Sequence, residues 1–172
     1  MARGQMARQL WVLRHAEAEP HGVAPDAARR LTARGEDQAR LAGAALARLG
    51  ATFEAVLYSP KERARRTAEL AVEQWDGAAA HVLREHPPLS EGFDAAAALD
   101  ALAGLDEDAR LLVVGHEPDL STVVAELAGG GHVDLKKGGL AVVRLTGIRG
   151  ELAALMRPRE LALIAGAPIL AI

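Results

Sequence analysis

The sequence contains no cysteine, which excludes disulfide bonds, thiolate metal sites and a cysteine nucleophile. Aromatic residues make up only 3% of the chain, so alanine and leucine must supply most of the core, as in helices packed closely on a sheet. No window approaches the roughly 20 apolar residues of a membrane-spanning helix, and the N-terminus lacks the apolar segment of a secretory signal. These absences predict a cytoplasmic protein without a membrane partner.

Neither sign of charge is in large excess, since the formal net charge is −3. The chain therefore has no general attraction to nucleic acid, and any anion site must come from a local cluster of arginines. The length of 172 residues fits one domain. We expect residues 10–172 to form it and the polar, basic residues 1–9 to be a frayed or disordered lead-in.

Apolar runs and capping residues predict the order of strands and helices. Buried strands are expected at 10–13, 53–58 and 110–114, an edge strand at 78–83, and a hairpin at 139–145 and 151–156. Helices are expected at 33–49 with Thr32 as N-cap, from 60 onward with Ser59 as N-cap, at 94–102 and at 118–127. The apolar segment 158–172 fits either a short helix or a packed tail. This order predicts a three-layer α/β sandwich with a mostly parallel sheet, helices on both faces and a mixed C-terminal hairpin.

Arginine or histidine side chains follow each of the three strongest strands. Arg14 and His15 follow the first, Arg63 comes soon after the second, and His116 follows the third. In an open α/β sheet, ligands bind beyond the carboxyl ends of the strands, so these side chains are expected to meet at one edge. Taken singly, each has a simpler explanation as a solvated or structural side chain, but their joint placement favours an anion site.

Such a site can transfer a phosphoryl group. With a reference pKa of about 6.5, the imidazole of His15 is largely neutral at pH 7, and one ring nitrogen is a free nucleophile if the other donates to a carbonyl. The guanidinium groups of Arg14 and Arg63, with Arg29 as a further candidate, can bind phosphate oxygens in bidentate fashion, and His116 can add a donor. This chemistry requires no metal or other cofactor.

Five segments together resemble the motifs of a known family. They are LWVLRHAEAEP, DAARRLTARG, SPKERARRTAE, VVGHEPDLSTVV and LKKGGLAVVRL. In this order, from about residue 10 to 157, they resemble the histidine phosphatase superfamily, branch 1 (phosphoglycerate mutase-like), and most closely its short SixA-type phosphohistidine phosphatases. The resemblance implies that His15 is transiently phosphorylated, that Arg14, Arg63 and His116 form the phosphate pocket, and that Arg29 adds a peripheral contact. The chain departs from the family at Ala16, where many members carry glycine.

The general acid is not assigned to a single residue. Glu91 lies in the region where larger members place theirs, but Glu85 competes, and the chain can also lack one. A proton donor is typically worth ~100-fold or more for an alkoxide leaving group, whereas imidazole is protonated near neutral pH and leaves readily. A weak or absent acid therefore favours phosphohistidine over alkyl phosphate esters.

The expected function follows from these features. We expect a protein phosphohistidine phosphatase whose partner is a histidine-containing phosphotransfer domain, because a short chain without an inserted lid has a shallow pocket open to a protein side chain. The alternatives are a phosphatase of small esters, such as sugar phosphates, nucleotides or aryl phosphates, and a non-catalytic phosphate-binding module. The intact set of Arg14, His15, Arg63 and His116 argues against the module.

Overall fold

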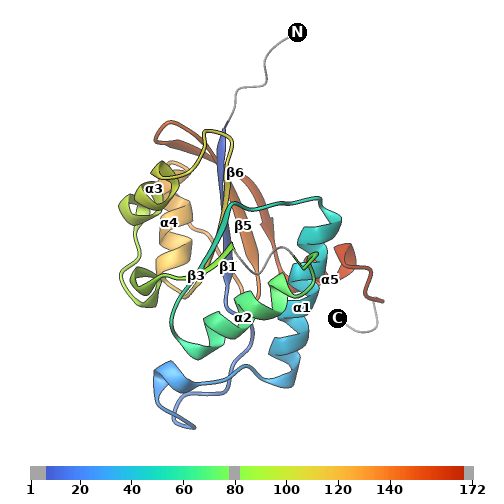
Figure 1. Ribbon diagram of the computed structural model, residues 1–172. Helices are drawn as coiled ribbons and strands as arrows, with labels where there is room; N and C mark the ends of the chain where they lie inside the picture. Colours follow the sequence, from blue (N-terminus) through green and yellow to red (C-terminus); the bar gives the residue numbers. More distant parts are fainter. Residues whose placement is uncertain (1–6, 78–81, 169–172) are drawn as a thin grey trace.

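The apolar runs form one six-stranded sheet in the computed structural model, which describes residues 7–77 and 82–168 (Figure 1). The strands are β1 (Arg8–Arg14), β2 (Ala55–Tyr58), β3 (Leu83–Glu85), β4 (Arg110–Gly115), β5 (Leu140–Thr146) and β6 (Arg149–Met156). Their order is β3-β2-β4-β1-β5-β6. The first four in this order are parallel, whereas β5 and β6 form an antiparallel hairpin beside β1.

The register of the parallel strands brings three carboxyl ends together. Arg14 of β1 lies beside Gly115 of β4, and Tyr58 of β2 lies beside Val114. The loops that follow β1, β2 and β4 all begin at this edge, within one residue of one another along the strand direction. The lower end of the sheet in Figure 1 is therefore the place where residues from distant parts of the chain can meet.

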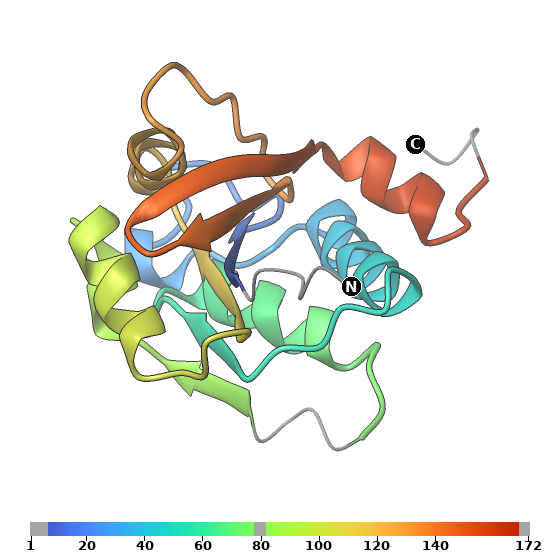
Figure 2. The ribbon, with the colours of Figure 1, turned by 90° about the horizontal axis from the view of Figure 1, so that it is seen from above.

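Helices cover both faces of the sheet, as the view along it in Figure 2 shows. One face is covered by α1 (Ala33–Arg48), α2 (Glu62–Val72) and α5 (Pro158–Ile164), and the other by α3 (Ala95–Ala103) and α4 (Asp119–Leu127). The predicted three-layer architecture with a mostly parallel sheet and a C-terminal hairpin is confirmed. No helix in the described part of the chain is long and apolar enough to cross a membrane.

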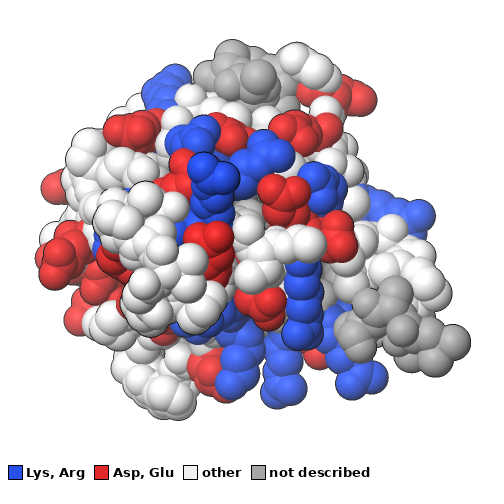
Figure 3. Space-filling view, turned by 90° about the horizontal axis from the view of Figure 1, so that it is seen from below, with Lys and Arg blue, Asp and Glu red and all other residues white. Residues whose placement is uncertain are grey.

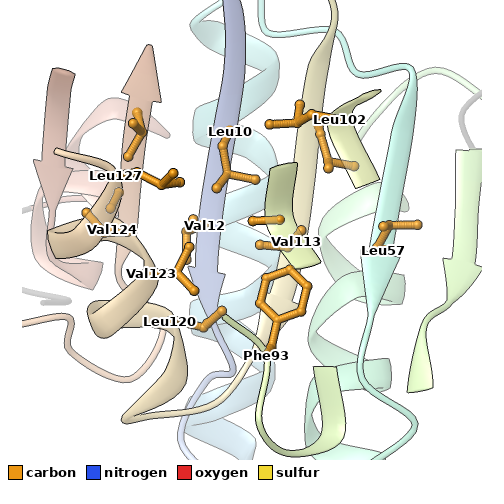
Figure 4. Close-up of a cluster of buried hydrophobic side chains, with 14 of the residues drawn as sticks. Leu10, Val12, Leu57, Phe93, Leu102, Val113, Leu120, Val123, Val124 and Leu127 are labelled. Carbon is orange, nitrogen blue, oxygen red and sulfur yellow. The ribbon is translucent and has the colours of Figure 1, made fainter. Parts of the chain in front are cut away.

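Alternation along the strands divides the core between the two faces. Leu10 and Val12 of β1 face α3 and α4, whereas Leu13 faces α1 and α2, and all three are fully buried. Figure 4 shows the first of these clusters, in which Val12 lies beside Val123 of α4 and Val113 lies beside Phe93. Because both faces of the central strands are covered, the sheet provides a rigid platform for the loops at its carboxyl edge.

The helix ends test the capping predictions. Thr32 caps α1 by accepting a hydrogen bond from the Gly35 N–H (3.0 Å), as predicted. The prediction that Ser59 caps α2 is wrong, because α2 begins only at Glu62 and Lys61 occupies the N-cap position. The chain makes an extra bend after Tyr58, and the Ser59 hydroxyl points to another partner, described below.

Several strand boundaries also differ from the sequence prediction, since β2 begins at Ala55 and not at residue 53, and β6 begins at Arg149 and not at residue 151. β1 begins at Arg8, inside the expected lead-in, because Gln9 is paired on both sides, with Arg110 of β4 and Arg144 of β5. The edge strand expected at 78–83 is observed as β3 at Leu83–Glu85, and residues 78–81 lie outside the described part of the chain. The C-terminal segment 158–172 fits either a helix or a packed tail by its sequence, and its first half forms the helix α5.

Replacing Gly43 by alanine is expected to destabilise the fold by about 1 to 3 kcal/mol, because α1 and α2 are in contact at this point. A Cβ atom at Gly43 would overlap the Ala71 carbonyl of α2. The matched control is Gly104→Ala at the C-cap of α3, where a Cβ atom meets nothing within 4 Å and stability should hold or rise slightly. Thermal unfolding followed by circular dichroism measures both, and equal Tm values for the two variants would contradict the packing argument.

Candidate active site

Side chains from the segments that follow β1, β2 and β4 meet beyond the carboxyl ends of these strands, with Arg63 contributed by the first turn of α2. His15, Arg63 and His116 are all buried, with 5%, 4% and 8% of their surface exposed. The centroids of the His15 and His116 rings are 5.2 Å apart, and Arg63 Nε lies 3.4 Å from His15 Nε2. The structure thus brings together the three groups that the sequence places at widely separated positions.

The surroundings of His15 define which ring nitrogen is free. Nδ1 lies 2.7 Å from the carbonyl oxygen of Ala16, which can only accept, so Nδ1 carries the proton and Nε2 carries the lone pair. Ala16 is itself fixed, because its N–H donates to Thr67 Oγ1 (3.1 Å) from α2. Burial lowers the pKa of His15 to about 3, with further lowering by His116, Arg63 and Arg14, so the imidazole is neutral at pH 7.

Arg63 reaches this nitrogen because Asp26 holds it in place. Arg63 Nη1 donates to the Asp26 carbonyl oxygen (2.7 Å), and Nη2 donates to the Asp26 carboxylate (3.3 Å). The same carboxylate binds Lys61 Nζ at 3.0 Å and Arg29 through Nε and Nη2 at 3.1 and 3.0 Å. The hydrogen bond from Lys61, followed by that from Arg29, holds the pKa of Asp26 well below its usual range. One carboxylate thus links three cations.

The hydrogen-bond partners of Arg29 differ from those of Arg63. Besides its two bonds to Asp26, it donates through Nη1 to the carbonyl oxygen of Glu19 (2.7 Å). The side chain is buried, and each of its three nitrogens has a protein acceptor. The structure therefore places Arg29 as a support for Asp26, and the peripheral phosphate contact implied by the resemblance stays a prediction.

Arg14 is supported by the segment that follows α4. Its Nη1 donates to the Leu135 carbonyl (2.9 Å), while the N–H of Gly138 lies 3.0 Å from the His15 carbonyl and 3.1 Å from that of Arg14. Gly138 adopts a left-handed conformation, with φ of 72°, that favours glycine. Within the described residues, buried Arg14 Nε has no hydrogen-bond partner. It is a donor available to an anion.

His116 offers a second buried donor or acceptor. Its Nε2 lies 2.7 Å from Ser59 Oγ, and Nδ1 has no partner in the described part of the chain. Burial lowers the pKa of His116 to about 3, with further lowering by the nearby cations Arg63 and Lys61. The ring is therefore neutral at pH 7, like that of His15.

The cluster around His15 and His116 has more positive than negative charge, although the surface around it does not. Arg14, Lys61 and Arg63 surround the two rings, and Asp26 is the carboxylate bound within the cluster. Figure 3 looks onto this end of the molecule and shows Lys and Arg interspersed with Asp and Glu. The geometry suits a small dianion next to His15 Nε2 better than a large acidic surface.

The arginines that follow Arg63 on α2 point elsewhere. Arg65 pairs with Glu62 and Glu69 at 2.6 Å, and Arg66 lies within 3.7 Å of Glu36 and Glu69. Cations near the N-terminus of a helix are unfavourable because they oppose the helix dipole. Carboxylates of the protein balance Arg65 and Arg66, and only Arg63 among the three belongs to the cluster.

Neither candidate acid is bound to the cluster. Glu91 is exposed and follows the 3₁₀ turn Pro87–Ser90, and Glu85 is exposed at the end of β3. Across residues 7–77 and 82–168, neither carboxylate makes a hydrogen bond or ion pair. The loop behind Glu91 is fixed instead by Asp119, whose carboxylate accepts from the Gly92 N–H at 2.7 Å. The described residues also contain no group of three or more His, Cys, Asp or Glu side chains placed to hold a metal ion.

Four residues of the cluster are not among the sequence-based candidates, namely Asp26, Ser59, Lys61 and Thr67. For two of these residues, neighbouring positions in the sequence indicate the contact. Asp26 and Arg29 are an acidic and a basic residue three positions apart, and Thr67 is one helical turn beyond Arg63, to whose carbonyl its hydroxyl donates at 2.6 Å. The partners of Ser59 and Lys61 come from other parts of the chain and have no such signal.

The two neutral rings predict a pH dependence of stability. Their pKa values near 3 lie below the ~6.5 of an unfolded chain, so the unfolded state binds more protons between these values. Stability is then lost as the pH falls below about 6.5, at about 1.4 kcal/mol per pH unit for each ring. In urea unfolding at pH 5 and 6, His116→Gln should reduce the wild-type slope by that amount. An unchanged slope would contradict the assignment of a neutral buried ring.

Comparison with known proteins places the chain in a family. A model of the histidine phosphatase superfamily (branch 1) matches residues 10–91. An uncharacterized protein from Picosynechococcus sp. is 37% identical over 146 residues, which cover 79% of this chain and 84% of that protein. The chain belongs to the histidine phosphatase superfamily, branch 1, and is a phosphatase.

Solved structures share the fold over most of the chain. The protein histidine phosphatase SixA complexed with tungstate has 29% sequence identity and a TM-score of 0.79, over 89% of this chain and 99% of that one. A putative alpha-ribazole-5'-P phosphatase from Escherichia coli str. K-12 has 22% identity and a TM-score of 0.73, over 88% of this chain and 97% of that one. The predicted resemblance to the superfamily and its SixA-type members is confirmed.

Proposed function

We propose that the phosphatase reaction passes through a phosphohistidine on His15. The Nε2 lone pair attacks phosphorus, a P–N bond forms, and the bond to the leaving group breaks with its electron pair, which takes up a proton. Water then attacks the phosphohistidine, the P–N electrons return to Nε2, and inorganic phosphate is released. The observation that carries the proposal is the Nδ1 contact to Ala16, which leaves Nε2 as a buried, unprotonated nucleophile.

Fixed positive charge around Nε2 supports this role. Arg63 Nε already lies 3.4 Å from Nε2, so a phosphoryl group on that nitrogen comes within reach of the same guanidinium. Arg14 Nε and His116 Nδ1 are buried atoms without partners among the described residues and are available to its oxygens. In phosphoryl transfer, most of the catalytic effect comes from positioning and from charge stabilisation of the equatorial oxygens, which this arrangement supplies.

The substrate that we propose is phosphohistidine on a protein, such as a histidine-containing phosphotransfer domain. Asp26 is the carboxylate within the cluster, and three bound cations keep it ionised, so it is a poor proton donor. Imidazole leaves without a strong acid because it is itself protonated near neutral pH, whereas an alkoxide does not. The 29% identity to a protein histidine phosphatase supports the same choice.

A comparison of substrates tests this proposal. The kcat/KM value for a phosphorylated histidine-containing phosphotransfer domain should exceed those for sugar phosphates, nucleotides and a chromogenic aryl phosphate, and a chelator should leave all of them unchanged. Higher values for a small ester would favour an ester phosphatase instead. No turnover above that of His15→Ala with any substrate would favour a phosphate-binding module.

Removing either candidate acid is expected to change little with the proposed substrate. Glu91→Gln and Glu85→Gln should each keep kcat for phosphohistidine within about 3-fold of wild type, because the leaving group needs no carboxylic acid. The two variants serve as controls for each other, since both exchange an exposed carboxylate for an amide. A loss of ~100-fold in one of them alone would identify the acid and contradict the argument about the leaving group.

A further inference from the structure

The hydroxyl of Ser59 has few ways to satisfy its hydrogen bonds. Ser59 is fully buried, directly beyond the end of β2, and its own N–H is held by the Val114 carbonyl of β4 at 3.0 Å. The Lys61 N–H donates to Ser59 Oγ at 3.3 Å, which uses a lone pair and leaves the hydroxyl proton to be placed. In the described part of the chain, His116 Nε2, at 2.7 Å, is the one acceptor found for it.

This hydrogen bond decides where the proton of the His116 ring lies. If Ser59 donates to Nε2, then Nε2 carries a lone pair, and the single N–H of a neutral imidazole is on Nδ1. In the opposite tautomer, Nε2–H faces a hydroxyl whose own proton has no acceptor, and a second lone pair is buried at Nδ1. Nδ1 has no partner among the described residues in either tautomer, but only the opposite tautomer also leaves the Ser59 hydroxyl proton without an acceptor. Burying an additional unpaired polar group is unfavourable, so the first arrangement is the more stable one.

We infer that Ser59 is a positioning residue that fixes neutral His116 in its Nδ1–H tautomer and so makes Nδ1–H a donor for the phosphoryl group. Two independent observations support this inference. One is the hydroxyl contact at Nε2, and the other is the buried Nδ1 without a partner among the described residues. The inference rests on the proposed function, because the acceptor of Nδ1–H is the phosphoryl group bound next to His15.

Because His116 is neutral, its tautomer decides whether Nδ1 is a donor or an acceptor. A protonated ring would present N–H groups on both sides, whatever Ser59 does, but burial together with Arg63 and Lys61 keeps the pKa of His116 far below 7. The charges that act on the ring are, in order of effect, those of Arg63 and Lys61, then Asp26 with the opposite sign, and then Arg14. A neutral ring in the wrong tautomer would turn a lone pair towards an anion.

The test is a direct observation of the tautomer in the full chain labelled with ¹⁵N-histidine. Long-range ¹H–¹⁵N spectra near pH 7 distinguish Nδ1–H from Nε2–H, and His116→Gln assigns the signals. We expect Nδ1–H in the wild type, and a shift towards Nε2–H in Ser59→Ala together with about 10-fold weaker binding of inorganic phosphate. The matched control is Ser121→Ala on α4, which removes a hydroxyl bonded to the Pro118 carbonyl and should leave both readouts unchanged.

The outcomes separate this inference from the proposed function. Nε2–H in the wild-type protein would overturn the inference even if Ser59→Ala failed to fold, and so would a Ser59→Ala spectrum and phosphate affinity equal to wild type. If the tautomer behaves as expected but His15 never becomes phosphorylated, the proposed function fails while the effect of Ser59 on the ring stands. A normal phosphohistidine on His15 with the wrong His116 tautomer would overturn the inference alone.

Discussion

Replacing His15 by alanine is expected to lower kcat by at least about 10⁴-fold for every phosphate substrate. The variant lacks the atom that forms the P–N bond, and the remaining arginines can only bind the phosphoryl group. Phosphate binding should therefore survive in part while turnover is lost. Initial rates with an aryl phosphate and with a phosphorylated protein measure the effect.

The matched control for this variant is His132→Ala. His132 is exposed between α4 and β5, and its removal should keep kcat within about 2-fold of wild type. Thermal unfolding of both variants separates loss of catalysis from loss of fold. Residual turnover of His15→Ala within 10-fold of the wild-type rate would show that another group attacks phosphorus.

Replacing Arg63 by lysine is expected to lower kcat by about 10²- to 10³-fold, although the charge is kept. Arg63 uses all three nitrogens, Nε towards His15 and both Nη atoms towards Asp26. A lysine has one nitrogen and cannot hold the Asp26 contacts and face the phosphoryl group at the same time. Steady-state kinetics should show the loss mainly in kcat, since the developing charge is stabilised in the transition state.

Arg65→Ala gives the matched control on the same helix. Arg65 pairs with Glu62 and Glu69 on the surface of α2 and has no contact with His15 or Asp26. Its removal should change kcat by less than about 2-fold, because exposed ion pairs contribute little. Equal losses in the Arg63 and Arg65 variants would mean that the general charge of α2 matters, and not the fixed guanidinium beside His15.

Much of the fold could be predicted because its signals are local. The apolar runs of β1, β2 and β4 and the capping residue Thr32 are each visible within a few neighbouring positions. The rule that ligands bind beyond the carboxyl ends of parallel strands then places Arg14, His15 and His116 near one another without further information.

What could not be predicted depends on contacts between distant segments. In the sequence, Asp26 has a local signal only for Arg29, three positions away, and only the fold shows that Lys61 and Arg63, more than 30 positions away, share its carboxylate. The sequence around Ser59 is typical of a helix N-cap, but the hydroxyl bonds to a ring 57 positions away. In both cases, the local pattern describes an ordinary structural role, and the tertiary contact gives the residue a different one.

The most direct test of the central claim is to identify the phosphorylated atom during turnover. Wild-type protein mixed with substrate, quenched in alkali to preserve phosphohistidine and analysed by mass spectrometry should carry one phosphoryl group on His15. NMR of the trapped species should place it on Nε2, since Nδ1 is bound to the Ala16 carbonyl. Product release without phosphorylated His15, or a phosphoryl group on His116, would contradict the account.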